Sequence, residues 1–415
     1  MGGPPGGGSD SPGSDGDRGP GEGSPVGPLT DGPHPGVNEL LAEARFLDHH
    51  VHTILAGRLP AHRLLEILSE SNRPQAAHRA GMETQLGVAL RRWCAPFLGL
   101  PAGVPSGVYL AQRANLDNGE VAARLLPAAG LAGLLVDTGY PLADVVPLEQ
   151  LAVLAGAPVR AVLRLEELAE RVIARVDRAE AFPAAFQEAL AEEGQRAIGV
   201  KSIVAYRVGL DLDLRPPQPA EVVKATGAWL ASRAAGNLRL ANPVIEAFLL
   251  WSAVELGKPL QLHTGFGDPD LDLQRANPLL LTDFLRRTEG RLWVLLLHTY
   301  PFHREAAYLA HVFPHVAFDV GLAVHHSGVG SEAILAEALE IAPWAKVLYS
   351  SDAWGIPELH LLGSWLVRRG LARILGRWVA AGDWDLSDVK RFVEAFGVGN
   401  AREIYGLADA DLRTA

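Results

Sequence analysis

The stretch Phe46-Leu47-Asp48-His49-His50-Val51-His52 ends a short apolar run with two histidines, His50 and His52, that are two positions apart. In a β-strand, side chains at positions i and i+2 point to the same face. We therefore expect the two imidazoles to project together from the end of an early strand, with His49 facing away from them. Two imidazoles held in this way form half of a site for a divalent metal.

Seven further apolar, β-branched runs follow, separated by longer segments rich in Ala, Leu, Arg and Glu. Strands that alternate with helices predict a parallel α/β architecture, and eight of them favour a (β/α)8 TIM-type barrel. An open, doubly wound sheet is the alternative, but no glycine-rich phosphate-binding turn follows the first run. The expected strands are Phe46–His52, Gly133–Thr138, Val159–Leu165, Gly199–Ala205, Leu260–Thr264, Leu292–His298, Val316–Val320 and Val347–Asp352.

The segments between the strands carry helical patterns. The segment from Leu55 to Ala129 is too long for one crossover, so we expect it to form extra helices over the mouth of the barrel. The other expected helices are Pro183–Glu193, Ala220–Ala235, Pro243–Leu256, Pro278–Arg287 and Glu332–Ile341.

Composition divides the chain into two parts. Residues 1–36 are dominated by Gly, Pro, Ser and Asp, which cannot bury enough surface to offset chain entropy, so we expect a disordered N-terminal tail. Residues 37–415 are expected to form the barrel domain, and removal of residues 1–36 is expected to leave stability and rate unchanged.

Charge and cysteine content indicate the partners and the compartment. The formal net charge of −11 argues against a nucleic-acid or anionic-membrane partner. No apolar run is long enough to span a membrane, and residues 1–35 lack the features of a secretory signal. The single cysteine, Cys94, fits a reducing cytoplasm. By analogy with other barrels, whose exposed helices often pair, we expect a homo-oligomer that acts on a small molecule.

Chemically unusual residues lie at or near the carboxyl ends of the expected strands. Because parallel strands of a barrel all end on one face, these side chains should meet in one pocket. Imidazoles, a carboxylate and an amine form the ligand inventory of a borderline-soft divalent metal such as zinc. The set comprises His50, His52, Lys201, His263, His298 and Asp352.

This ordered series resembles the amidohydrolase superfamily. The stretches from Gly199 to Arg207 and from Leu262 to Asp268 are similar to its amidohydrolase-related branch, which includes the N-terminal part of fungal FluG-type proteins. The resemblance covers residues 40 to 405 and implies a divalent metal cofactor, Zn²⁺ in the first place and Mn²⁺ as the alternative, with one or two ions bound. It implies that His50, His52, His263 and Asp352 are metal ligands. It further implies that His298 is a ligand or polarises the substrate, and that Lys201 is at the position carboxylated in binuclear members.

Such a site predicts hydrolysis of a C–N amide bond by metal-activated water, with Asp352 as the proton carrier. We expect Arg207 and Tyr206, after the fourth strand, and Asp268, after the fifth, to bind the substrate. With the FluG-type resemblance, these residues suggest a γ-glutamyl or other amino-acid-like amide. The alternatives are non-oxidative decarboxylation by the same superfamily and a non-catalytic signalling or assembly module.

Overall fold

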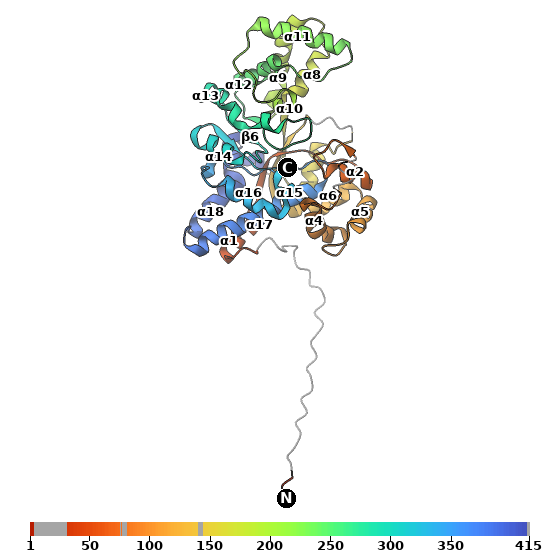
Figure 1. Cartoon of the computed structure of the whole chain (residues 1–415), viewed down its shortest axis with the longest axis vertical. Helices are drawn as coiled ribbons and strands as arrows, with labels where there is room; N and C mark the ends of the chain where they lie inside the picture. Colours follow the sequence, from red (N-terminus) through yellow and green to blue (C-terminus); the bar gives the residue numbers. More distant parts are fainter. Residues whose placement is uncertain (4–30, 75, 77–80, 140–143, 413–415) are drawn as a thin grey trace.

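The computed structural model describes residues 1–3, 31–74, 76, 81–139 and 144–412. Its strands form one sheet in the order of the sequence, and every neighbouring pair is parallel, as expected for consecutive β/α units (Figure 1). The strands are β1 (Phe46–Val51), β2 (Leu131–Asp137), β3 (Val159–Arg164), β4 (Gly199–Ser202), β5 (Leu260–His263), β6 (Val294–Leu297) and β7 (Val316–Phe318).

The eighth expected strand closes the ring as a short extended segment, residues 347–353. On one side the Leu348 amide donates to the Phe318 carbonyl of β7 at 3.0 Å. On the other side the His49 amide of β1 donates to the Tyr349 carbonyl at 3.1 Å. These bonds connect the last strand to the first, so the predicted barrel is confirmed.

Helices cover the outside of the barrel, and those between β3 and β5 form a lobe at the top of Figure 1. The predicted extra helices between β1 and β2 are present as α2, α4, α5 and α6. The α-helices are α1 (Pro35–Glu43), α2 (Ala61–Ile67), α4 (Gln85–Ala89), α5 (Ser106–Asn115), α6 (Asn118–Leu125), α7 (Leu148–Ala155), α8 (Leu165–Ile173), α9 (Phe182–Arg196), α10 (Val204–Arg207), α11 (Pro219–Ala234), α12 (Pro243–Leu256), α13 (Thr282–Thr288), α14 (His303–Val312), α15 (Ala323–Ser327), α16 (Ser331–Ala338), α17 (Pro357–Ala381), α18 (Leu386–Glu394) and α19 (Asn400–Tyr405).

Apolar side chains pack in two layers. The larger cluster lies between the strands and the surrounding helices. The smaller one fills the barrel interior at the amino ends of the strands, where α19 closes the opening. Its buried members are Leu47, Leu135, Val162, Leu295, Leu297, Ala317, Leu348, Ala401, Ile404, Tyr405 and Leu407.

The period of two expected along the first strand is broken by a bulge. Between Asp48 and Val51, β1 carries one more residue than the facing part of β2. Both His49 and His50 are consequently buried inside the barrel, and the expectation that His49 faces away from its neighbours is wrong.

The fourth strand is shorter than predicted, because the chain turns into α10 after Ser202. The amide of Ile203 donates to the buried Glu166 carboxylate at 2.8 Å, as does the Ser202 hydroxyl at 2.5 Å. An amide used in this way cannot extend the ladder of the sheet, so the predicted strand Gly199–Ala205 ends early.

The domain boundary lies before the predicted residue 37. Helix α1 begins at Pro35, and the Asp31 carboxylate forms ion pairs of 2.7 Å with Arg369 and Arg373 of α17. Residues 31–36 therefore pack on the barrel. The rest of the predicted tail, residues 4–30, lies outside the described residues, and the two-part division stays a prediction.

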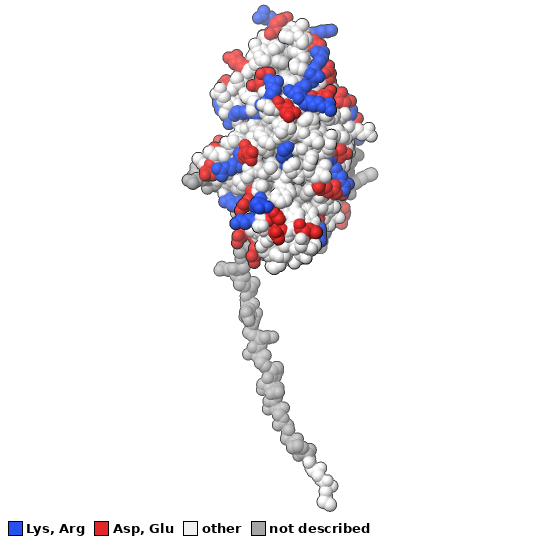
Figure 2. Space-filling model, turned by 90° about the vertical axis from the view of Figure 1, so that its left-hand side faces the viewer, with Lys and Arg blue, Asp and Glu red and all other residues white. Residues whose placement is uncertain are grey.

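Within the described part of the chain, no helix combines the length and the apolar character needed to cross a membrane. Basic and acidic side chains are interspersed over the face drawn in Figure 2.

Candidate metal centre

The end of β1 presents two imidazoles through the same ring nitrogen. His50 Nδ1 lies 2.7 Å from the Gln261 side-chain oxygen, and His52 Nδ1 lies 3.2 Å from the Asp137 carbonyl. Both partners are acceptors, so each Nδ1 carries a proton and each Nε2 faces the cavity. Burial, with the charge of Lys201, lowers the pKa of His50 to about 4, which keeps this imidazole neutral at pH 7.

Asp352 and His298 enter the cavity from the ends of the closing segment and of β6. Both have left-handed backbone conformations, with φ of 50° for Asp352 and 58° for His298, which are unusual for residues other than glycine. Such strain is concentrated at functional sites. Burial would raise the pKa of Asp352, but the surrounding imidazoles hold it well below its ordinary value, so this carboxylate is ionised.

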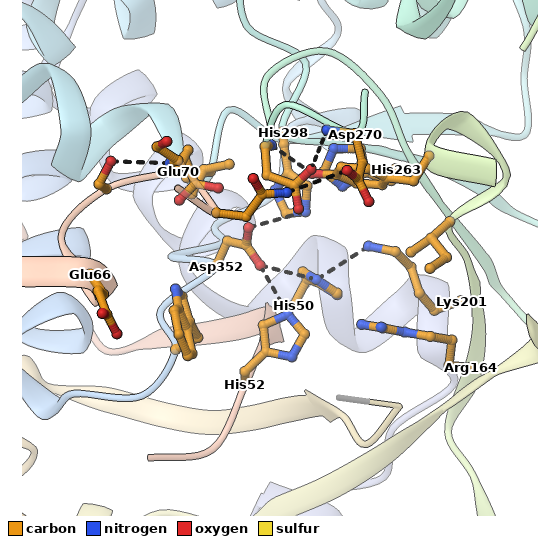
Figure 3. Close-up of a pocket in the computed structure, with 18 of the residues that line it drawn as sticks. His50, His52, Glu66, Glu70, Arg164, Lys201, His263, Asp270, His298 and Asp352 are labelled. Atoms are coloured by element: carbon orange, nitrogen blue, oxygen red, sulfur yellow. Dashed lines mark hydrogen bonds and ion pairs between the residues drawn. The ribbon is translucent and has the colours of Figure 1, made fainter. Parts of the chain in front are cut away.

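The nitrogens gather around this carboxylate at coordination spacing (Figure 3). Asp352 Oδ1 lies 3.2 Å from His50 Nε2 and 3.4 Å from His52 Nε2. Asp352 Oδ2 lies 3.4 Å from His298 Nε2. These distances exceed the roughly 2.7–2.9 Å of a charge-assisted hydrogen bond. Donors bound to one ion at about 2.0–2.1 Å in a tetrahedral shell lie about 3.3 Å apart. His50, His298 and Asp352 form a group of donors that fits a divalent metal, and His52 lies beside this group, 3.4 Å from Asp352 Oδ1.

Lys201 adjoins this shell, whereas His263 lies at its edge. Lys201 Nζ is 3.4 Å from His50 Nε2, and burial lowers the pKa of the lysine to about 8. The His263 ring is 4.8 Å from that of His298, but its Nε2 lies 3.1 Å from the Phe266 carbonyl. The structure therefore brings Lys201 to the centre and leaves His263 outside the group of converging donors.

The three predicted substrate-binding residues all line the cavity, whose volume is about 700 Å³. The ring of Tyr206 packs against that of His263 at a tilt of 53°, with ring centroids 4.5 Å apart, and the Tyr206 hydroxyl accepts the Asp268 amide at 3.3 Å. Arg207 Nη1 instead lies 3.1 Å from Glu170, and 10% of the arginine side chain is exposed. Arg207 therefore forms part of the cavity wall, and Glu170 neutralises its charge.

Two residues of the cavity region escaped the sequence analysis. Asp137 ends β2 beside His50 and His52, close enough to form a second potential metal-binding group with them. Arg164 ends β3, lines the cavity, and donates to Asp137 Oδ2 through Nε at 3.1 Å and Nη2 at 2.5 Å. Burial opposes ionisation of Asp137, but Arg164 more than offsets it and lowers the pKa of this carboxyl. Their position at strand ends, the rule applied to Asp352, was the signal that could have found them.

Comparisons with known proteins identify the family. A family model described as amidohydrolase matches residues 48–407. The chain belongs to the amidohydrolase family, as the resemblance in its sequence indicated.

Individual relatives agree with this assignment. A crystal structure from Lactobacillus casei, described as a candidate metal-dependent hydrolase, is 30% identical with a TM-score of 0.79, covering 91% of this chain and 98% of that one. Protein fluG of Emericella nidulans is 30% identical over 237 residues, which are 54% of this chain and 27% of the fungal protein. The match thus spans about a quarter of the fungal protein.

A more distant likeness concerns the fold alone. The uronate isomerase of Bacillus halodurans is 14% identical, with a TM-score of 0.60 over 90% of this chain and 96% of that one. The same barrel fold therefore occurs in a protein described as an isomerase rather than a hydrolase, so the fold alone does not define the reaction.

Proposed function

We propose that this protein is a metal-dependent hydrolase that cleaves an amide-type C–N bond in a small substrate, with Zn²⁺ as the ion and Mn²⁺ as the alternative. The observation that carries the proposal is the convergence of three imidazole nitrogens on one ionised carboxylate at 3.2 to 3.4 Å. Such a set suits an ion better than it suits hydrogen bonding.

The roles of the side chains follow from their positions. A divalent ion held by His50, His52, His298 and Asp352 would act as a Lewis acid and lower the pKa of water. Asp352 then accepts a proton from the attacking water and returns it to the leaving nitrogen, because its carboxylate faces the cavity and is ionised. If His298 is not a ligand, its ring, whose Nε2 faces Asp352 Oδ2, is placed to polarise the scissile carbonyl instead.

Lys201 has a separate role in the proposal. Its pKa of about 8 increases the fraction of neutral amine, which can add to CO₂ with loss of a proton to give a carbamate. Its Nζ lies 3.4 Å from His50 Nε2, so an added carboxylate would reach the shell and could bridge to a second ion. His263 would ligate in that arrangement only after its ring nitrogen leaves the Phe266 carbonyl.

The cavity supports a substrate that carries both signs of charge. Arg164 and Lys201 lie beside His50, whereas Glu70 and Asp270 lie on the side of His298 (Figure 3). Asp268 lines the same cavity. A carboxylate fits beside Lys201, since Arg164 already pairs with Asp137, and an ammonium fits the second group. An amino-acid-like amide, such as a γ-glutamyl amide, meets both requirements.

Non-oxidative decarboxylation is the second candidate, and one observation favours it. The donors gather around a single carboxylate, which serves one ion without need of a bridging lysine. A non-catalytic module is the third reading, and the filled ligand positions argue against it.

The experiment that tests the proposal is metal analysis of wild type and Lys201→Ala, with exposed Lys390→Ala as the control. Two ions falling to one or none in Lys201→Ala would support a carbamate-bridged hydrolase. One ion in all three proteins would make Lys201 dispensable and favour decarboxylation. No ion after incubation with Zn²⁺ or Mn²⁺ would overturn both enzymatic readings.

A substrate screen completes the test. Release of an amine from γ-glutamyl and related amides would support hydrolysis, whereas release of CO₂ from unsaturated or aromatic acids would support decarboxylation. Isomerisation of a uronate with every amide intact would replace hydrolysis by the reaction in the name of the fold neighbour.

A further inference from the structure

A buried amide links the metal centre to the opposite end of the barrel. Gln261 of β5 accepts from His50 Nδ1 at 2.7 Å. Its nitrogen donates to the Tyr405 hydroxyl at 2.7 Å and to the His49 carbonyl at 2.8 Å. Gln261, His49 and His50 are fully buried and Tyr405 is 5% exposed, so these bonds form away from solvent.

The same hydrogen-bonded chain continues to a second residue of the shell. The Tyr405 hydroxyl lies 3.1 Å from His49 Nδ1, and His49 Nε2 lies 2.9 Å from Asp319 Oδ2. The other oxygen of Asp319 accepts the backbone amide of His298 at 3.1 Å. The network therefore begins at one residue of the proposed shell and ends at another.

One arrangement of protons satisfies every hydrogen bond of this network with Asp319 as the acceptor at its end. A carboxylate can only accept, so His49 donates through Nε2 and accepts through Nδ1 from the Tyr405 hydroxyl. Tyr405 in turn accepts from the Gln261 nitrogen, which places the Gln261 oxygen toward His50. His50 must then hold its proton on Nδ1, which leaves Nε2 free to bind an ion.

We propose that Tyr405 of helix α19 is a positioning residue for His50, acting through the orientation of Gln261. The inference rests on the proposed metal centre, since its effect is on the affinity of that centre. Without the phenolic oxygen, one donor hydrogen of Gln261 loses its acceptor, and only the bond to the His49 carbonyl still opposes a turn of the nitrogen toward His50. A donor facing Nδ1 moves the proton of His50 to Nε2, where it blocks the metal.

The test compares Tyr405→Phe with Tyr349→Phe, a matched change at another buried tyrosine whose hydroxyl lies outside this network. The Kd for Zn²⁺ is measured by competition with a chromophoric chelator, and the stability of the metal-free proteins by urea unfolding. Tyr405→Phe is expected to weaken Zn²⁺ binding about ten- to a hundredfold, the usual cost of losing an outer partner of a ligating histidine. Tyr349→Phe is expected to change the Kd less than about twofold, because it leaves the partners of the ligands in place.

Rescue and tautomer state distinguish positioning from a purely structural role. Gln261→Glu in the Tyr405→Phe background keeps an acceptor on His50 when the protonated oxygen of the carboxyl group donates to the His49 carbonyl, and it is expected to restore Zn²⁺ affinity. In metal-free wild type, nitrogen NMR of labelled histidines is expected to show His50 protonated at Nδ1, which tests the inference even if a variant fails to fold.

The outcomes separate the two proposals. Equal Zn²⁺ affinity of wild type and Tyr405→Phe, or a His50 proton on Nε2, would overturn this inference and leave the metal centre intact. A loss of stability in Tyr405→Phe with an unchanged Kd would show that Tyr405 only stabilises the closure of the barrel by α19, and it would overturn the positioning role. A wild type that binds no Zn²⁺ would overturn the metal centre and this inference with it.

Discussion

The two ends of the barrel differ in chemistry and in conformational strain. At the amino ends of the strands, Ile404 of α19 packs against inward-facing Leu47 and Leu135 in an apolar cluster. At the carboxyl ends, His298 and Asp352 hold left-handed backbone conformations around a buried charge. The amino end thus accumulates favourable burial, whereas the carboxyl end carries strain and desolvation that the rest of the fold must offset.

This separation shows how one fold can contain a strained and desolvated site, because apolar burial at the other end supplies the stability. Substitutions at the carboxyl end should alter chemistry with little loss of stability, and substitutions at the amino end should do the reverse. Tyr405 is an exception to this separation. It belongs to the apolar cluster at the amino end, and its hydroxyl is also hydrogen bonded to His49 and Gln261, which connect it to His50.

The largest effect is expected at the carboxyl end. Asp352→Asn should lower the turnover of an identified substrate at least about a hundredfold, because it removes the proton carrier and an anionic ligand. Bound metal should fall in parallel, while urea unfolding of the metal-free protein stays within about 1 kcal/mol of wild type, since no packed volume is lost. Asp177→Asn, at a side chain that is 96% exposed, is the control. Retention of more than a tenth of the wild-type rate would contradict the assignment.

The opposite pattern is expected at the amino end. Leu295→Ala, inside the barrel at a position with no exposure, should reduce the free energy of unfolding by about 2–4 kcal/mol through lost burial and a cavity. The Kd for Zn²⁺ should change less than about threefold, because Leu295 makes none of the hydrogen bonds behind the ligands. A tenfold weaker Kd without partial unfolding would show that the two ends are not separate.

The smallest effect is expected outside both ends, where Asp31 binds α17. Hydrogen bonding from Arg373 and the nearby charge of Arg369 lower the pKa of Asp31 below its ordinary 3.8. A lowered pKa in the folded state stabilises above the ordinary value, and this contribution disappears as pH falls through the folded value. Asp31 is 40% exposed, so Asp31→Asn should cost less than about 1 kcal/mol at pH 7.

Urea unfolding at neutral and at acidic pH checks this prediction. The difference between wild type and Asp31→Asn should shrink below about pH 4. A difference that grows on acidification would contradict the ion pair as its source. Deletion of residues 1–30 should leave stability unchanged, whereas deletion of residues 1–36 should lower it, because it removes this contact and the start of α1.

The sequence predicted the site best for residues whose role follows from their position at the end of a strand. The alternation of runs and helices located each strand, and strand-end polarity located His50, His298 and Asp352, because parallel strands end on one face. The convergence of these side chains is therefore a property that periodicity can predict.

What the sequence could not show depends on contacts between distant segments. The bulge that turns both His49 and His50 inward is visible only in the pairing of β1 with β2. The link from Gln261 to Tyr405 joins residues 144 positions apart, and no local pattern marks it. The early start of the packed chain at Asp31 depends likewise on arginines of α17, 338 and 342 positions away.

The seam between the first and the last strand gives the barrel a further property. His50 and His52 lie on one side of this seam and Asp352 on the other, although the chain supplies them near its beginning and its end. An ion held by all three would fasten the seam, so that opening of the barrel and release of the ion become one event. Binding to the closed form alone stabilises it in proportion to the logarithm of the free ion concentration. The supply of metal in the surroundings would then set the lifetime of the folded chain as well as its activity.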